Sequence, residues 1–406
     1  MKDLPVSPLA PQKFPSLPEV KGVYAATYSL GMYGKPRDDL LVVNFLSSAS
    51  VAGTFTKSNT RSCDVDWCAE ALKHGFARGL VVNAGNSNAF TGQAGIDKNN
   101  ATLEKYCEIA GCLKEEVFLS ATGVIGVPVA KDLISSKLEA VWDKLEPANW
   151  EKMATAIATT DTFIKGAGKT IEIDGKTINI AGIAKGSGMI APNMATMLVY
   201  IFTDANIASR ELQKLVSEYT EKTFNAITVD SDTSTSDTLL VFATNEAGNK
   251  DLTDKDTAFA DALYEIMLDL ALQVVKDGEG ATKFIKVDVV GAKDDASAKV
   301  IAMAIANSPL VKTAIAGGDA NWGRVAMAVG KCLEPINVDK LSIQFCGQWV
   351  AKDGGAVKYD ESLIDEKMAG TDIEILVDVA VGDGKYTAYT CDLTHGYITI
   401  NGDYRS

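Results

Sequence analysis

Histidine is nearly absent from this sequence of 406 residues, which contains only His74 and His395. A histidine-rich zinc site or a Ser-His-Asp relay would have to be built from these two residues. His74 falls in a segment predicted to be helical, residues 67–78, and His395 lies near the C-terminus. We interpret both as incidental polar residues, so an enzyme of this sequence is not expected to use histidine as its base.

Positive charge and long apolar runs are also scarce. The 39 Lys and Arg residues stand against 53 Asp and Glu residues, a net charge of −14, which disfavours binding to a nucleic-acid backbone. The longest apolar stretch, residues 189–202, contains Pro192 and Asn193 and is shorter than the roughly 20 residues that a bilayer requires. Residues 1–18 are proline-rich and lack the apolar core of a secretory signal. We therefore expect a cytoplasmic protein with neither a nucleic-acid nor a membrane partner.

Cysteine pairs in redox spacing are missing as well. The seven cysteines are an odd number and form no Cys-x-x-Cys pair. A chain of this length does not need disulfides to fold, so we expect reduced thiols. Cys107 and Cys112 are five residues apart, but two soft ligands do not make a metal site. We expect neither a metal ion nor a bound organic cofactor.

The overall amino-acid composition is that of a globular protein, with 47% hydrophobic and 23% charged residues. At about 100–200 residues per domain, the length predicts two or three domains. Short apolar runs between Gly, Asn and Ser turns predict strands in the N-terminal third, and a new strand-then-helix pattern starts at residue 284. We predict an α+β architecture with a larger domain over residues 1–283 and a smaller domain over 284–406.

One hairpin and several helices can be predicted with their boundaries. Asp174-Gly175 is a strong signal for a two-residue turn between strands over residues 170–173 and 177–180. After this hairpin, a glycine-rich approach leads to an apolar segment over residues 197–202, which places Thr196 at the mouth of a buried strand. The predicted helices cover residues 102–113, 131–145, 150–158, 209–224, 257–276 and 296–306.

The segment over residues 185–198 has three interpretations. The plainest is a glycine-rich turn followed by a threonine that merely starts a strand. A phosphate-binding loop requires its lysine after the glycines and a helix beyond, whereas here Lys185 precedes the glycines and a strand follows. In the third interpretation, Thr196 is a nucleophile whose own α-amino group is the base, available once the preceding peptide bond is cut. A free α-amine has an unperturbed pKa of about 7.7–8.0, so this site needs no histidine.

Seven further blocks accompany this segment along the chain. They are Asn83-Ala84-Gly85-Asn86-Ser87-Asn88-Ala89, Thr122-Gly123-Val124-Ile125-Gly126, Thr159-Thr160-Asp161-Thr162, Asp230-Ser231-Asp232-Thr233-Ser234-Thr235-Ser236-Asp237-Thr238, Gly278-Glu279-Gly280-Ala281-Thr282-Lys283, Asn321-Trp322-Gly323-Arg324 and Asn401-Gly402-Asp403-Tyr404-Arg405-Ser406. Together with residues 185–198, and in their order along the chain, these blocks resemble the ornithine acetyltransferase family. Its members are the bifunctional glutamate N-acetyltransferases of arginine biosynthesis. The resemblance extends from about residue 20 to the last residue.

This resemblance implies a precursor that cleaves itself between Ala195 and Thr196, giving an α chain of residues 1–195 and a β chain of residues 196–406. Thr196 would then take the acetyl group of N2-acetyl-L-ornithine and pass it to L-glutamate through an acetyl-enzyme, with acetyl-CoA left open as a further donor. The implied fold is an α/β/β/α-like sandwich with a smaller C-terminal α/β domain, and the cleavage site lies inside the larger, catalytic domain. The implied assembly is a heterotetramer of two α and two β chains.

The family's site residues map onto this sequence by position. By motif match, the oxyanion hole maps to Thr122 and the backbone N–H of Gly123. Glycine suits this role because it lets a backbone amide approach a substrate closely. Charge matching assigns Lys185 to a substrate carboxylate and Glu279 to a substrate ammonium. The residues expected to contact substrate are Thr159, Lys185, Thr196, Glu279, Asn401 and Ser406.

Some residues depart from the family pattern, and other functions compete with acetyl transfer. Ser406 stands where the family ends in threonine, which keeps the hydroxyl and drops a methyl group. Ile164 and Ala191 stand where proline and histidine are frequent, at positions without a chemical role. The competing functions are an N-terminal-nucleophile amidase or aminopeptidase, in which water takes the acyl group, and an uncut, non-catalytic protein that binds amino acids.

Overall fold

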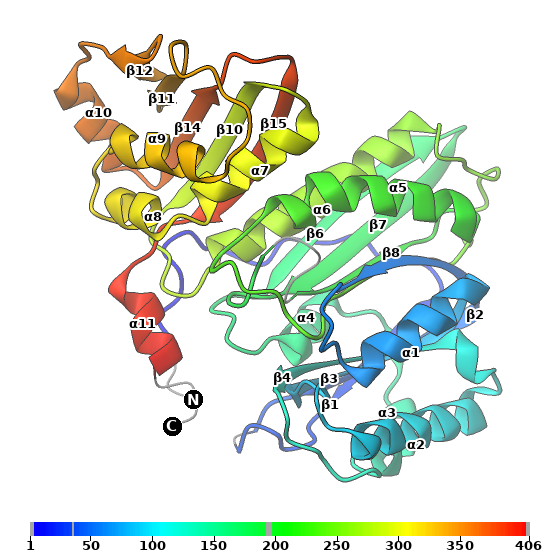
Figure 1. Cartoon of the computed structure of the whole chain (residues 1–406). Helices are drawn as coiled ribbons and strands as arrows, with labels where there is room; N and C mark the ends of the chain where they lie inside the picture. The colour runs from blue at the N-terminus through cyan, green and yellow to red at the C-terminus, as the bar shows by residue number, and fades with distance from the viewer. Residues whose placement is uncertain (1–3, 35, 192–196, 403–406) are drawn as a thin grey trace. The chain divides into compact units, whose positions relative to one another are not determined.

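The computed structural model describes residues 4–34, 36–191 and 197–402, and its backbone contacts divide the chain into two compact units (Figure 1). The larger unit consists of residues 12–225 and 232–271, and the smaller unit consists of residues 1–11, 226–231 and 272–406. The domain boundary predicted near residue 284 stays a prediction.

The larger unit is built on one hydrogen-bonded sheet of nine strands. Their order is β4-β3-β2-β9-β8-β7-β6, and β1 pairs with both β2 and β5. The strands are β1 (Val23–Tyr28), β2 (Leu40–Phe55), β3 (Phe76–Asn86), β4 (Val117–Val124), β5 (Glu146–Pro147), β6 (Lys165–Ile173), β7 (Lys176–Lys185), β8 (Leu198–Thr203) and β9 (Thr238–Ala243).

Strand β2 carries this sheet from one layer of a sandwich into the other. Its first residues pair with β1 and β3, its last six pair with β9, and the register shifts between Asn44 and Ala49. Aromatic side chains from both layers meet in between: the Phe45 ring centroid lies 4.9 Å from that of Phe242 and 6.3 Å from that of Phe202. Because Phe45 and these partners belong to strands on opposite sides of the shift, the two halves of the sheet pack face to face.

Helices cover the outer face of each layer. Leu103 and Tyr106 of α2 and Val141 of α3 pack on the outward side chains of the first layer, and Leu270 of α6 approaches Gly182 of β7 in the second. The helices of this unit are α1 (Cys63–Ala71), α2 (Gln93–Ala110), α3 (Leu138–Trp142), α4 (Trp150–Ile157), α5 (Ser209–Lys222) and α6 (Thr257–Lys276), the last of which extends into the smaller unit. The α+β class and the α/β/β/α-like sandwich predicted from the sequence are confirmed.

Most predicted elements of this unit are also confirmed. The hairpin turns at Asp174 and Gly175, whose φ angles of 50° and 70° suit a two-residue hairpin turn, and α6 covers the predicted residues. Three helices were predicted with wrong ends. The one predicted over residues 102–113 is part of α2, which begins at Gln93 and ends at Ala110. The helix over residues 131–145 is a 3₁₀ turn and the short α3, and the helix over 67–78 ends early because Gly75 adopts a left-handed conformation, φ 74°, before β3 begins.

The smaller unit has a six-stranded sheet in the order β13-β12-β11-β14-β10-β15, in which β10 and β14 are parallel. Its strands are β10 (Phe284–Ala292), β11 (Ser342–Phe345), β12 (Gln348–Lys352), β13 (Gly355–Ala356), β14 (Asp372–Asp378) and β15 (Gly384–Cys391). Its helices are α7 (Asp295–Ala306), α8 (Pro309–Ala316), α9 (Trp322–Lys331), α10 (Glu361–Met368) and α11 (His395–Gly402). Across the described ranges, no single helix is long and apolar enough to span a membrane; the pair α7 and α8 passes by length and composition together but is bent by 54°.

Candidate active site

Thr122 and Gly123 lie at the end of β4, where this strand runs parallel to β3. Gly123 is paired with Gly85 and has a φ of 132°, and a β-carbon on it would lie 2.4 Å from the carbonyl carbon of Gly85. Only glycine therefore fits at this position. The neighbouring Thr122 is 6% exposed, so its hydroxyl must find its hydrogen-bond partners inside the protein or in a bound molecule.

A buried polar network supports the end of β3, the strand that pairs with β4 at Gly123. Lys98 pairs with Asp64 at 3.4 Å and donates to Asn83 Oδ1 at 3.2 Å, and both members of the ion pair have side chains only 2% exposed. Asn83 in turn donates to the carbonyl of Asn86. The asparagines belong to the block Asn83 to Ala89, but nothing in the spacing of the sequence links them to Asp64 or Lys98.

Lys185 lies at the end of β7, and its ammonium nitrogen is 3.3 Å from the hydroxyl oxygen of Thr122. The lysine is 3% exposed and pairs along the sheet with Leu198, the first residue of β8. Thr122 and Lys185 are 63 positions apart in the sequence, and the structure brings these two predicted site residues into contact.

Asp161 organises the backbone around Lys185 and Thr159. Its carboxylate accepts hydrogen bonds from the N–H of Gly186 at 2.7 Å, from the N–H of Thr159 at 2.9 Å and from the ammonium of Lys165 at 2.6 Å. Burial alone would raise the pKa of this carboxyl, but the charges of Lys165 and Lys185 and the hydrogen bond from Gly186 lower the pKa below its usual value. Asp161 belongs to the block Thr159 to Thr162, but no pattern in the sequence indicates a role for it.

Asp237 is a second buried carboxyl near the start of β8. Its Oδ1 accepts a hydrogen bond from the N–H of Met197 at 2.8 Å, and Met197 follows Thr196 directly in the chain. Complete burial raises the pKa of this carboxyl well above its usual value, because the hydrogen bond from Met197 and the charge of Lys185 do not compensate for the lost hydration. Asp237 belongs to the block Asp230 to Thr238, and no pattern in the sequence indicates a role for it either.

Glu279 and Asn401 meet in the smaller unit. The side-chain amide of Asn401 donates to Glu279 Oε2 at 2.7 Å, and Glu279 is 8% exposed. Gly280, with φ 74°, allows this contact because a β-carbon there would lie 2.4 Å from the backbone nitrogen of Tyr397 in α11. The tight packing of α11 against this glycine brings Asn401 back to Glu279, 122 positions away.

The predicted site residues are therefore distributed over both units. The larger unit holds Thr122, Gly123, Thr159 and Lys185, and the smaller unit holds Glu279 and Asn401. The two residues that flank the predicted cut, Ala195 and Thr196, and the C-terminal Ser406 lie outside the described residues.

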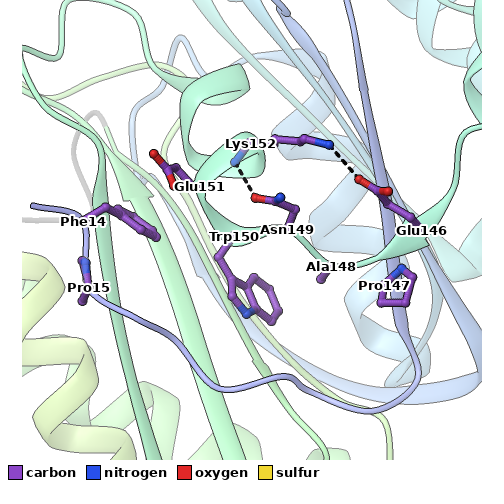
Figure 2. A pocket seen from close by; sticks show the side chains of 9 residues that line it. All are labelled: Phe14, Pro15, Glu146, Pro147, Ala148, Asn149, Trp150, Glu151 and Lys152. Carbon is purple, nitrogen blue, oxygen red and sulfur yellow. Dashed lines mark hydrogen bonds and ion pairs between the residues drawn. The ribbon is translucent and has the colours of Figure 1, made fainter.

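One surface pocket of the larger unit is separate from the predicted site residues. A pocket of about 490 Å³ is bounded by Phe14 and Pro15 and by residues 146–152 (Figure 2), and it includes none of the predicted site residues. In this pocket the side chain of Lys152 pairs with Glu146, and the backbone N–H of Lys152 is bonded to Asn149. In the described part of the chain, no group of three or more His, Cys, Asp or Glu side chains could hold a metal ion.

Comparison with known proteins gives matches over the whole chain. The family model described as "ArgJ family" matches residues 24–406. The arginine biosynthesis bifunctional protein ArgJ of Zymomonas mobilis is 52% identical and that of Gluconobacter oxydans 50% identical, covering 99% and 100% of this chain and 99% and 96% of the relatives. A crystal structure of the arginine biosynthesis bifunctional protein argJ from Bacillus halodurans is 39% identical, with a TM-score of 0.49, over 51% of this chain and 98% of that chain.

Proposed function

This chain belongs to the ArgJ family, and we propose that it moves the acetyl group of N2-acetyl-L-ornithine to L-glutamate through an acetyl-Thr196 intermediate. It is an acetyltransferase of arginine biosynthesis. The observation that carries the proposed mechanism is the contact of Thr122 with Lys185, beside a glycine whose place admits no side chain. A family match alone indicates which reaction to expect, whereas this contact identifies chemical groups that could take part in the reaction.

The reaction begins with self-cleavage. Thr196 Oγ attacks the carbonyl carbon of Ala195, the peptide bond to the Thr196 nitrogen breaks, and water hydrolyses the resulting ester. The products are an α chain of residues 1–195 and a β chain of residues 196–406 that begins with a free threonine amine. This amine then accepts the proton of the Thr196 hydroxyl whenever the hydroxyl attacks an acetyl group.

Acetyl transfer follows in two steps through the same hydroxyl. Thr196 Oγ attacks the acetyl carbonyl of acetylornithine, and ornithine leaves with the proton on its α-amine. The α-amine of glutamate then attacks the acetyl ester, which gives N-acetylglutamate and restores the threonine. In both steps the oxyanion would accept hydrogen bonds from the Thr122 hydroxyl and the Gly123 N–H, and one such preorganised donor contributes about 2.7–4 kcal/mol to stabilising the transition state.

Charged and hydrogen-bonding residues would bind the substrate. We propose Lys185 for a carboxylate and Glu279 for an ammonium, with Asn401, Thr159 and Ser406 as hydrogen-bonding residues. The support for this assignment is chemical: Glu279 is buried except for 8% of its surface, and its carboxylate is oriented by Asn401.

A product assay tests the proposed reaction. Purified protein incubated with acetylornithine and glutamate should release ornithine and N-acetylglutamate in equal amounts, measured by mass spectrometry. If ornithine and acetate appear at the same rate without glutamate, the enzyme is a hydrolase and the proposed transfer is wrong. A third incubation with acetyl-CoA and glutamate, without acetylornithine, decides whether acetyl-CoA is also a donor.

The remaining expectations extend this proposal. We propose a cytoplasmic heterotetramer of two α and two β chains that works without a metal ion or organic cofactor. Size-exclusion chromatography with light scattering tests the assembly, and full activity after exhaustive dialysis against a chelator tests the independence from metal.

Replacement of Glu279 by glutamine should raise the KM for acetylornithine by about tenfold or more, with a smaller change in kcat. The substitution removes the negative charge that would pair with the substrate ammonium, and a hydrogen bond to a charged group contributes about 1.5–3 kcal/mol. The glutamine carbonyl still accepts the hydrogen bond that Asn401 donates at 2.7 Å, so the local structure should persist. Steady-state kinetics with acetylornithine as the varied substrate measures the effect.

The matched control is Glu366→Gln, the same chemical change on the exposed surface of α10. It should leave KM and kcat at the values of the wild type. An unchanged KM in Glu279→Gln would remove Glu279 from the proposed substrate pocket.

A further inference from the structure

We infer that Lys185 is a positioning residue of the oxyanion hole: its ammonium donates a hydrogen bond to Thr122 Oγ and thereby directs the Thr122 hydroxyl proton toward the reacting carbonyl oxygen. This inference rests on the proposed function and gives Lys185 a role beyond contact with a substrate carboxylate. The separation of 3.3 Å between the two side-chain atoms is its geometric basis.

The direction of this hydrogen bond follows from the groups themselves. An ammonium group has three donors and no acceptor, whereas a hydroxyl has one donor and two acceptor lone pairs. In the contact between Lys185 and Thr122, the threonine oxygen must therefore be the acceptor. Its own proton cannot point at Lys185 and remains available for a second partner. A hydroxyl that accepts from a cation is also a stronger donor, because hydrogen bonds in a chain polarise one another.

Lys185 is held in place to perform this role. It is 3% exposed at the end of β7, and the neighbouring N–H of Gly186 is bonded to Asp161 at 2.7 Å. The carboxyl of Asp161, whose pKa is lowered in part by the charge of Lys185, provides a negative charge that favours a buried ammonium. A long side chain fixed in this way can orient one hydroxyl without a large loss of entropy at each turnover.

A donor without a carboxylate separates the two roles of Lys185. p-Nitrophenyl acetate has an acetyl carbonyl but neither a carboxylate nor an ammonium. Thr196 Oγ attacks its carbonyl, p-nitrophenolate leaves with the bonding electrons, and the hydroxyl proton passes to the Thr196 amine, so that acetyl-Thr196 forms. A residue that only anchors a substrate carboxylate cannot affect this step, whereas a residue that orients the oxyanion donor must.

The test is the rate constant of the p-nitrophenolate burst in wild type and Lys185→Met. We expect a decrease of about tenfold to a hundredfold, and a similar decrease in kcat with acetylornithine. Thr122→Val keeps the shape of the side chain and removes the hydroxyl. In this background, Lys185→Met should lower the rate constant of the burst by less than about threefold. An unchanged burst in Lys185→Met, or equal losses in both backgrounds, would overturn the inference.

Maturation is controlled in the same experiment. Rates are normalised to the fraction of chain with a free Thr196 amine, determined by peptide mass. Lys185→Arg keeps the charge and the donors, and it should retain at least part of the burst. If Lys185→Met does not mature, the self-cleavage rates of the precursors replace the burst. They are compared among the wild type, Lys185→Met, Thr122→Val and the variant that carries both substitutions. A wild type that shows neither burst nor acetyl transfer would refute the proposed function itself, whereas a wild-type burst that is independent of Lys185 refutes only this inference.

Discussion

Replacement of Thr196 by alanine is expected to leave the protein as a single full-length chain and to abolish acetyl transfer. The wild type should appear on a denaturing gel as two fragments of 195 and 211 residues. Alanine offers no hydroxyl to attack the carbonyl of Ala195, so the peptide bond stays intact and no free threonine amine forms. We expect activity to fall by about 10⁴-fold or more, because one residue provides both the nucleophile and the base.

Thr196→Ser is the matched control for this variant. It keeps the hydroxyl and, after cleavage, the α-amine, so it should mature and should retain measurable acetyl transfer. Edman degradation or peptide mass should place the new N-terminus at residue 196. A wild-type chain that stays uncut, or a cut at another bond, contradicts the mechanism, and the amino-acid-binding alternative would then gain support.

Replacement of Asp161 by alanine is expected to lower the free energy of unfolding by about 3–5 kcal/mol. Asp161 and Lys165 form an ion pair of 2.6 Å in which both side chains are at most 2% exposed. Removal of the carboxylate breaks this ion pair of the buried Lys165 and takes away the acceptor of the Thr159 and Gly186 N–H groups. Urea unfolding should be measured in the uncut Thr196→Ala chain, so that the same single chain unfolds in every variant.

The pH dependence of stability gives a second measure of Asp161. The folded pKa of this carboxyl is lower than its unfolded value, which is about 3.9. The stabilisation is therefore fully present above the unfolded pKa and is lost as the pH falls through the lowered folded pKa. The difference in unfolding free energy between the Thr196→Ala chain and the same chain with Asp161→Ala should be constant above about pH 5. It should shrink in more acidic solution.

An exposed aspartate is the control for both measurements. Asp365→Ala, on the surface of α10, should change the unfolding free energy by no more than about 0.5 kcal/mol. If Asp161→Ala is equally mild, the carboxylate of Asp161 does not organise this part of the structure, and its place beside Lys185 is incidental.

The sequence by itself determined the chemistry. The near absence of histidine excluded the common relays, and the order of the family blocks identified the reaction, the bond predicted to be cut and the residues expected around it. Local signals also determined much of the secondary structure, such as the turn at Asp174-Gly175 and the helix α6 (Thr257–Lys276), because turns and long amphipathic helices depend on residues close in the chain. The same local signals predicted a helix over residues 131–145 that is longer than the observed one. Tertiary contacts and short turns compete with helical periodicity there.

Only the tertiary structure decided which residues support that chemistry. The sequence predicts Lys185 as a partner of a substrate carboxylate, and the fold puts its ammonium 3.3 Å from the hydroxyl oxygen of Thr122. No sequence pattern indicates a role for Asp161 or Asp237, which become important because both are buried beside the lysine. Burial and long-range contacts set the cost of a charge and the direction of a hydrogen bond, and neither is encoded by neighbours in the sequence. The sequence names the reacting groups, and the packing of β4 (Val117–Val124) and β7 (Lys176–Lys185) in one sandwich decides how they are oriented.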